Sequence, residues 1–321
     1  MTFDGGDETT RRTALKSGAT AVSLLAVGSL SGCSSIPFLS GGGSYTEWVP
    51  APDGFQESES LTVYQSKPSE IADNEDNFDE DYYDENLEND VDKLDIDYED
   101  MTLNIGVLAG FSLPVQVYDG DYEAQTVVDA LEDEDTGEGP FAEDGEYEGY
   151  TVYLNDSDDA PDNPQTAYGL DGTLVVEASA TEDLDAEEML ELVIDTNNGD
   201  GTLFTDDSED FSALTDELGD GTTLVGGVSE DASEEDDPDN GSFEGAVASG
   251  RVVTVNGETS DLKYVVVWDS EGDADEGDLE DYADNALDDE FDPNDDPSVG
   301  VSGRVGTIEF TYDTDELTSG I

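Results

Sequence analysis

The sequence predicts an α+β fold built from two tandem, mostly antiparallel β-sheet units with packed helices. Short runs rich in β-branched and aromatic residues, such as 151–154 and 263–268, are bounded by Gly, Asn and Asp, which is typical of strands. Two stretches with helical apolar spacing, 122–132 and 277–288, each follow a group of such runs. The order of these elements recurs in the two halves, which indicates a duplicated β-β-α-β-β-like unit.

The elements of the first half are expected in the order strand, strand, helix, strand, strand, at 102–108, 113–119, 122–132, 149–154 and 166–178. The second half repeats this order with one added strand, at 222–229, 243–256, 262–269, 277–288 (helix), 298–303 and 305–312. Between the halves, 185–193 and 211–218 have the apolar spacing of amphipathic helices. The acid-rich segments 73–100, 229–241 and 271–296 are expected to be solvated loops or acid-faced helices.

Four regions follow from this pattern. Residues 1–32 are expected to be a signal peptide and 33–44, which ends in Gly-Gly-Gly-Ser, a lipid anchor with a flexible tether. The remaining chain is longer than one core normally uses, so we expect a first α+β domain at 45–205 and a second at 206–321.

The N-terminus has the features of an export signal. Arg11 and Arg12 precede a weakly apolar run at 17–30, which is too short to span a bilayer as a helix and is typical of a twin-arginine signal. The run ends in Leu-Ser-Gly-Cys33, which resembles the lipobox of prokaryotic lipoproteins. Cys33, the only cysteine, is therefore the expected lipid attachment site, and a free or buried thiol is the alternative.

The charge of the chain limits its partners. It carries 86 acids, eight bases and a formal net charge of −78. Molar salt screens such self-repulsion, so the composition indicates a halophile, and the strand patterns argue against the alternative, intrinsic disorder. Too few bases remain to bind a phosphate backbone, so no nucleic-acid partner is expected. Anionic lipid is disfavoured too, and the membrane link would be the lipid on Cys33.

The residue types also limit the chemistry. Histidine is absent, which removes Ser-His-Asp and Cys-His catalysis and imidazole metal sites, and leaves carboxylates. The tripeptide 135–137 (Asp-Thr-Gly) matches aspartic proteases, but no second copy exists and no apolar strand precedes it. A hairpin or loop turn is the alternative interpretation of that tripeptide.

One segment resembles a calcium loop. Asp195, Asn197 and Asp200 alternate with other residues before Gly201, as oxygen ligands do around a hard cation. The register departs from the calcium-loop pattern by one residue, and a helix-terminating turn is the alternative. Calcium is thus a weak candidate, and no other cofactor is expected.

Two sequons offer glycosylation candidates. Asn155 and Asn240 begin Asn-Asp-Ser and Asn-Gly-Ser, both in expected loops. An exported chain would present either site to modification.

The signal, the acidity and one apolar block together resemble uncharacterised haloarchaeal twin-arginine-exported surface lipoproteins. The block reads Gly172-Thr-Leu-Val-Val, then Val193-Ile-Asp, Phe211 and Leu214. The resemblance implies a lipid-anchored protein on the extracellular face of the membrane, and it transfers no catalytic residues. We expect a non-catalytic module that binds an extracellular ligand or an envelope protein, or that supports the envelope. The alternatives are a carboxylate-based extracellular hydrolase and a solute-binding lipoprotein of a transporter, which would need two lobes around a cleft.

Overall fold

The computed structural model describes residues 44–51, 60–83, 87, 91–110, 112–133, 140–155, 166–181, 184–287, 291 and 293–317. The signal peptide with Arg11 and Arg12, the lipidation candidate Cys33 and the tripeptide 135–137 lie outside the described residues. None of the helices in the described part is long and apolar enough to cross a membrane.

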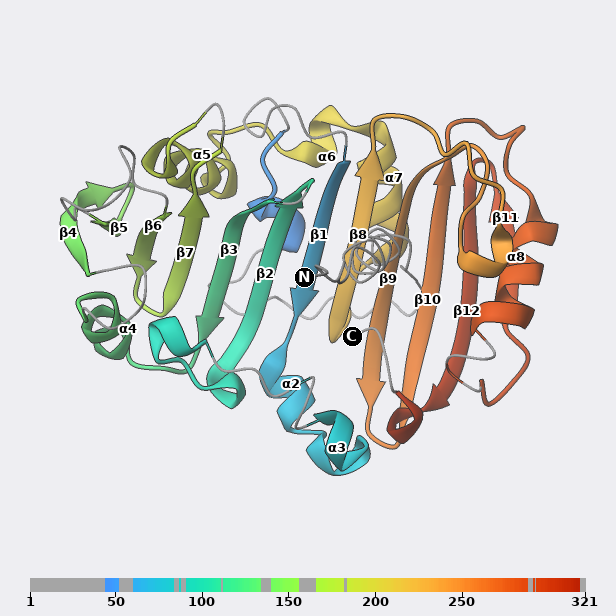
Figure 1. The fold of residues 1–321 in the computed structure, drawn as a ribbon, viewed down its shortest axis with the longest axis horizontal. Helices are drawn as coiled ribbons and strands as arrows, with labels where there is room; N and C mark the ends of the chain where they lie inside the picture. The colour runs from blue at the N-terminus through green and yellow to red at the C-terminus, as the bar shows by residue number, and fades with distance from the viewer. Residues whose placement is uncertain are drawn as a thin grey trace, which may run out of the picture.

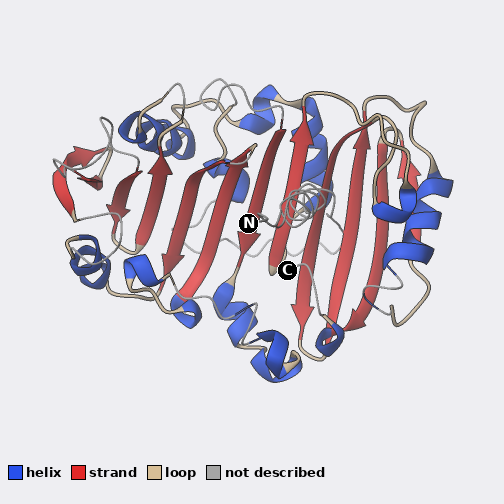
Figure 2. Ribbon diagram, viewed as in Figure 1, coloured by secondary structure: helices blue, strands red, loops and turns tan. Residues whose placement is uncertain are grey.

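The strands form one twelve-stranded antiparallel sheet in the order β11-β12-β10-β9-β8-β1-β2-β3-β7-β6-β5-β4 (Figures 1 and 2). Their bounds are β1 Ser60–Ser66, β2 Met101–Ala109, β3 Ser112–Gly120, β4 Phe141–Tyr147, β5 Tyr150–Asn155, β6 Thr166–Asp171, β7 Leu174–Ser179, β8 Thr223–Ser229, β9 Ala246–Asn256, β10 Thr259–Trp268, β11 Ser298–Ser302 and β12 Val305–Asp313. The α+β class and the antiparallel pairing are confirmed. The strands that the sequence assigns to two units join into a single sheet, because β1 pairs with β8, with Val63 opposite Gly226.

The helices are short. Their bounds are α2 Pro68–Ala72, α3 Glu80–Tyr82, α4 Ala124–Leu131, α5 Ala186–Asn198, α6 Phe204–Asp207, α7 Glu209–Leu218 and α8 Glu276–Tyr282. Single turns lie at η2 Tyr45–Trp48, η4 Glu75–Asn77, η6 Asp92–Leu94, η7 Tyr98–Asp100, η8 Pro238–Asn240, η9 Ala283–Leu287 and η10 Thr314–Glu316. The predicted helices at 122–132, 185–193, 211–218 and 277–288 are confirmed as α4, α5, α7 and α8 with η9.

The two halves of the sheet share one strand order. From the centre outward the first half runs β1-β2-β3-β7-β6 and the second runs β8-β9-β10-β12-β11, and a helix (α4 or α8) follows the third strand of each. Because β1 and β8 are antiparallel, the order and directions of these ten strands are the same after a half-turn about an axis perpendicular to the sheet. The first half adds the hairpin β4-β5 at its outer edge.

Helices α5 and α7 cover the same face of the sheet, here called the α5/α7 face. A Cβ on Gly169 would meet Leu190 of α5, and a Cβ on Gly226 would meet Leu218 of α7. Paired residues connect these two glycines across the sheet, and paired residues share a face. The opposite side is the α8 face, and in Figure 1 α7 passes behind β8 and β9 while α8 lies in front of β12.

Local capping explains where α5 and α7 begin and end. Asp185 accepts a hydrogen bond from the backbone N–H of Glu188, whose carboxylate accepts one from Asp185 in return, and Gly199 ends α5 at φ 81°. Ser208 caps α7 through the backbone N–H of Phe211. These caps start each helix so that its apolar stripe faces the sheet.

Several predicted strand bounds are wrong. The single strand expected at 166–178 is the hairpin β6-β7, because Gly172-Thr173 forms its turn with Gly172 at φ 62°. The strand expected at 243–256 begins only at Ala246. Strands β1 and β4 are missing from the prediction, and β1 is the counterpart of the strand that the sequence seemed to add in the second half. In β1 only Leu61 and Val63 are aliphatic among polar residues, and β4 is interrupted by consecutive acids and a bulge near Gly145, so neither has the apolar run typical of the other strands.

Candidate functional site

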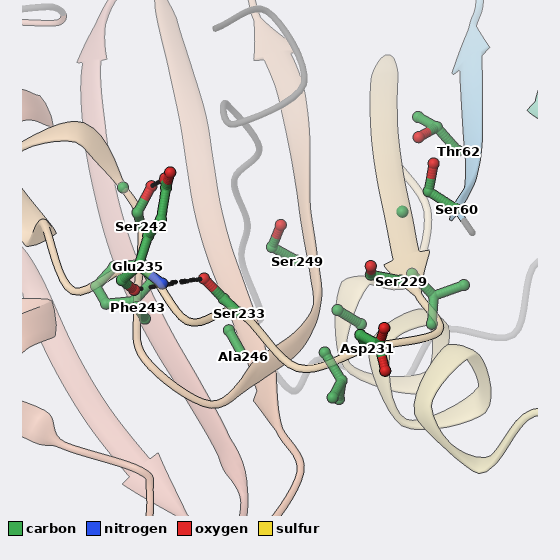
Figure 3. Close-up of a pocket in the computed structure, with 15 residues that line it drawn as sticks. Ser60, Thr62, Ser229, Asp231, Ser233, Glu235, Ser242, Phe243, Ala246 and Ser249 are labelled. Atoms are coloured by element: carbon green, nitrogen blue, oxygen red, sulfur yellow. Dashed lines mark hydrogen bonds between the residues drawn. The ribbon is translucent and has the colours of Figure 1, made fainter. Parts of the chain in front are cut away.

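A cleft of about 340 Å³ lies on the α8 face over the central strands β1, β8 and β9 (Figure 3). Six of the fifteen described residues that line it carry hydroxyl side chains, and these are Ser60, Thr62, Ser229, Ser233, Ser242 and Ser249. Asp231, Glu235 and Phe243 also line it, together with glycines, alanines and valines of the same segments. No lysine or arginine is among the described residues that line it.

Strand register builds the floor of the cleft. Thr62 of β1 lies opposite Gly227 of β8, and Gly227 lies opposite Ser249 of β9. A Cβ on Gly227 would come within 2.9 Å of the Thr62 Oγ1, so this position needs glycine. The missing side chain leaves a hollow between the two hydroxyl-bearing residues, and Ser60 and Ser229 form the next row.

The segment 230–245, here called the cleft wall, is held by backbone hydrogen bonds. The Ser233 N–H donates to the Ala246 carbonyl at 2.8 Å, and the Gly245 N–H donates to the Ser233 carbonyl at 2.8 Å. Farther along, the Asp237 N–H donates to the Ser242 carbonyl at 2.9 Å. This acid-rich loop, expected to be solvated, therefore has a defined shape in the structure.

The wall directs polar groups toward the cleft. The Ser242 hydroxyl donates to the Glu235 Oε2 at 3.4 Å, and the Glu235 N–H donates to the Ser233 Oγ at 3.2 Å (Figure 3). Phe243, only 2% exposed, seats the wall on the sheet through edge contacts with Tyr264, Trp268 and Tyr282. The ring thus supports the wall and does not offer a stacking surface to a ligand.

A second pocket of about 260 Å³ lies farther along the same strands. Tyr64, Ser66, Thr223 and Arg251 contribute to its lining. Arg251 is 6% exposed, and its guanidinium carbon lies 6.0 Å from the ring centre of Phe291. A buried guanidinium and three hydroxyls give this pocket a polarity different from that of the cleft.

Four of the five bases that follow Cys33 form ion pairs between separate elements. Lys67 contacts Asp220 at 2.9 Å, Lys93 contacts Glu177 at 2.5 Å and Lys263 contacts Glu217 at 2.8 Å, while Arg304 pairs with Asp210. Burial lowers the pKa of Lys263, against the opposing effect of Glu217. Each of these bases thus connects segments that are far apart in the sequence and is engaged within the fold.

The calcium candidates lie at the end of α5. Asp195 and Asn197 are helical, and Asp200 follows the terminal Gly199. The N–H groups of Asp200 and Gly201 donate to the Asp195 carbonyl, each at 2.9 Å, and the Asp195 Oδ1 accepts from the Tyr147 hydroxyl at 2.9 Å. The structure thus shows the helix-terminating turn at this place. Within the described ranges, no three acids or cysteines come together as a metal site would require.

The two sequons differ in setting. Asn240 is exposed in η8, at the cleft wall, and its amide donates to the Asp237 Oδ2 at 2.7 Å. Asn155 is half-buried at the end of β5, and the rest of its sequon lies outside the described residues.

Among the described residues, the carboxyl groups with a raised pKa are those of Glu187 and Asp278. For each, partial burial is the main cause and neighbouring acids add to it. Neither residue is among those that line the cleft. The geometry therefore offers hydrogen-bonding groups at the cleft, rather than a paired acid and base with unlike environments.

Sequence reasoning missed the cleft, although one signal was present. In β1 the residues Ser60, Thr62, Tyr64 and Ser66 alternate with apolar or buried neighbours, which places polar groups on one face. The other hydroxyls come from segments far away in the sequence, and only the sheet brings them together.

No protein-family model and no curated protein matches the sequence. Solved structures of TP0453 are similar in outline. Crystal form IV is 12% identical, with a TM-score of 0.43 over 86% of this chain and 98% of that one. Crystal form III is 11% identical, with a TM-score of 0.42 over 84% and 96%. A likeness at this level assigns no function to the chain.

Proposed function

We propose that this protein is a lipid-anchored extracellular surface protein of a halophile that acts as a non-catalytic binding module. The observation that carries the proposal is the hydroxyl-lined cleft on the α8 face, with its hydrogen-bonded wall and its floor opened by Gly227. Ligand sites are usually concave, and a small number of placed polar groups orients the ligand in them.

The charge distribution supports an extracellular, high-salt setting. Acids outnumber bases by 86 to eight, and four of the bases after Cys33 are engaged in ion pairs. Screening by molar salt would remove most of the repulsion among the acids. We therefore expect the unfolding midpoint to rise as NaCl is raised from low to molar concentration, as followed by circular dichroism. A flat, noncooperative signal at every concentration would favour disorder.

The shared strand order supports a tandem duplication. Each half supplies five strands in the same order with a helix after the third, and the seam is the β1-β8 pair. The proposed domain boundary at 205/206 falls inside α6. Each half would be one α+β unit, and the cleft would lie at their seam.

Cys33 provides the test of the anchor. Replacing Cys33→Ser should move the protein from the membrane fraction to the medium, because the thiol that would carry the lipid is lost. Replacing Arg11 and Arg12 with Lys should instead retain the protein inside the cell. Ser34→Ala is the matched control. It should leave the protein exported and in the membrane fraction. A Cys33→Ser protein that still sediments with membranes would contradict the anchor.

A carboxylate-based hydrolase is the second candidate, because Asp231 and Glu235 line the cleft. A hydrolase should turn over an extracellular polymer at molar salt. Substitution of either Asp231 or Glu235 should then abolish that activity. A solute-binding lipoprotein is favoured less, because the described strands form one sheet and not two lobes.

A further inference from the structure

We propose that the cleft binds a neutral oligosaccharide, an inference that rests on the proposed binding function and specifies its ligand class. The first argument is the hydrogen-bonding character of the lining. Serine and threonine hydroxyls both donate and accept, and the carboxylates of Asp231 and Glu235 accept. A sugar presents hydroxyls that do the same, and carboxylate acceptors strengthen such bonds.

The second argument is the position of two hydroxyls on the floor. Within the described part of the chain, no hydrogen bond engages the hydroxyls of Thr62 and Ser249, and both residues are half-buried. They lie on the two sides of Gly227, in the same cross-strand row. Two strand spacings separate their backbones, about 10 Å, which leaves room for a sugar ring over the glycine.

The third argument is charge. An anionic ligand would meet two carboxylates and no base among the described lining residues, and a net charge of −78 around them. A cationic ligand would gain little from that charge in molar salt, where the Debye length is about 3 Å. A neutral ligand held by hydrogen bonds is therefore the class that this site fits best.

The fourth argument is preorganisation. Backbone hydrogen bonds from Ser233 and Gly245 hold the cleft wall, and Phe243 fixes it to the sheet. A site that is already formed spends less of its binding free energy on ordering. Because Phe243 is buried and cannot stack on a sugar, we expect affinity in the range of weak, hydrogen-bonded recognition.

The test is a calorimetric titration of the full-length protein, purified in molar NaCl, with maltotriose, cellotriose and tri-N-acetylchitotriose. An Asn240→Gln background removes the nearby sequon, so that no attached glycan can fill the cleft. We expect at least one trisaccharide to bind. The double substitution Thr62→Val with Ser249→Ala should weaken that binding at least about tenfold, because two hydrogen bonds are lost while the shape is kept.

The matched control is Thr307→Val with Ser302→Ala, which removes the same two groups from β11 and β12, outside the cleft. This control should bind like the parent protein. If the cleft variant melts earlier than the parent, the single Ser249→Ala substitution, which only shortens a side chain, provides the comparison.

Three results would overturn the proposal: no heat with any of the trisaccharides, binding that the cleft substitutions leave unchanged, or a preference for spermidine that strengthens as salt is lowered. The last result would assign the cleft to a cation. Because the titration uses purified protein, it is independent of the Cys33 experiment. Failure of the ligand class is thus distinguishable from failure of the surface anchor.

Discussion

The two halves of the sheet share a strand order but bury the α8 face with different chemistry. One cross-strand row runs through both halves on that face. In the first half the row contains Gln116 and Glu177, and in the second half the equivalent positions are Tyr264 and Ile308. The same topology thus accepts an amide and a carboxylate in one half where the other half carries Tyr264 and Ile308, and Arg251 is the charged member of the row in the second half.

In the first half, here called the polar half, the polar side chains of the row are stabilised by specific ion and hydrogen-bond partners. Glu177 is 6% exposed and pairs with Lys93 of η6, while the Tyr118 hydroxyl approaches its other oxygen at 3.4 Å. Burial raises the pKa of Tyr118, and the negative charge of Glu177 adds to that effect. Gln116 donates to the Tyr64 hydroxyl at 2.9 Å. A buried carboxylate is tolerated only with such partners, so each contact matters.

The second half, here called the aromatic half, is stabilised by the packing of aromatic rings. Phe243, Tyr264 and Tyr282 meet with ring centres 4.8 to 5.9 Å apart, and Phe243 also contacts Trp268 at 6.0 Å. A Cβ on Gly306 would lie 2.7 Å from the Trp268 ring, so β12 carries glycine where the indole needs space. Such a cluster is stabilised by buried area and ring contacts, without any ion partner.

The largest expected effect concerns the aromatic half. Trp268→Ala removes a side chain that is 1% exposed, and it should lower the free energy of unfolding by about 3–5 kcal/mol. Chemical denaturation in molar NaCl measures this loss. A loss of unfolding free energy below about 1 kcal/mol would show that the aromatic cluster does not stabilise the second half through packing.

A smaller effect is expected for Lys93→Met in the polar half. The substitution leaves the Glu177 carboxylate, with a side chain 8% exposed, without its ion partner, so we expect a loss of about 1–3 kcal/mol. The Lys93 side chain is itself 32% exposed, and that solvent access keeps the loss below the range for a fully buried pair. Denaturation under the same conditions reports the change.

The smallest effect is expected for the matched substitution Lys263→Met. Here the buried member is the base, at 0% side-chain exposure, while the Glu217 side chain is 37% exposed and can reach water. Replacing a buried charge with an apolar side chain of similar length should change stability by less than about 1 kcal/mol. If Lys263→Met lowers the free energy of unfolding more than Lys93→Met does, burial of the carboxylate that remains does not determine the loss of stability.

Several features of the fold could be predicted from neighbouring residues. The apolar spacing of 185–193 predicts α5, because the apolar stripe of a helix is set by residues that are close in the sequence. The run at 262–269 predicts the buried strand β10 for the same local reason. By contrast, β1 was missed, since its polar positions are explained only by the α8 face on which they lie.

The sequence by itself determined the α+β class, the acidity and the absence of histidine chemistry, because these depend on composition and on short-range periodicity. Only the tertiary structure decided that there is one sheet and where a ligand could bind. Pairing of β1 with β8 joins residues far apart in the chain, and Gly227 between Thr62 and Ser249 opens the cleft at that seam. Register across strands is a long-range property, and no local pattern carries it.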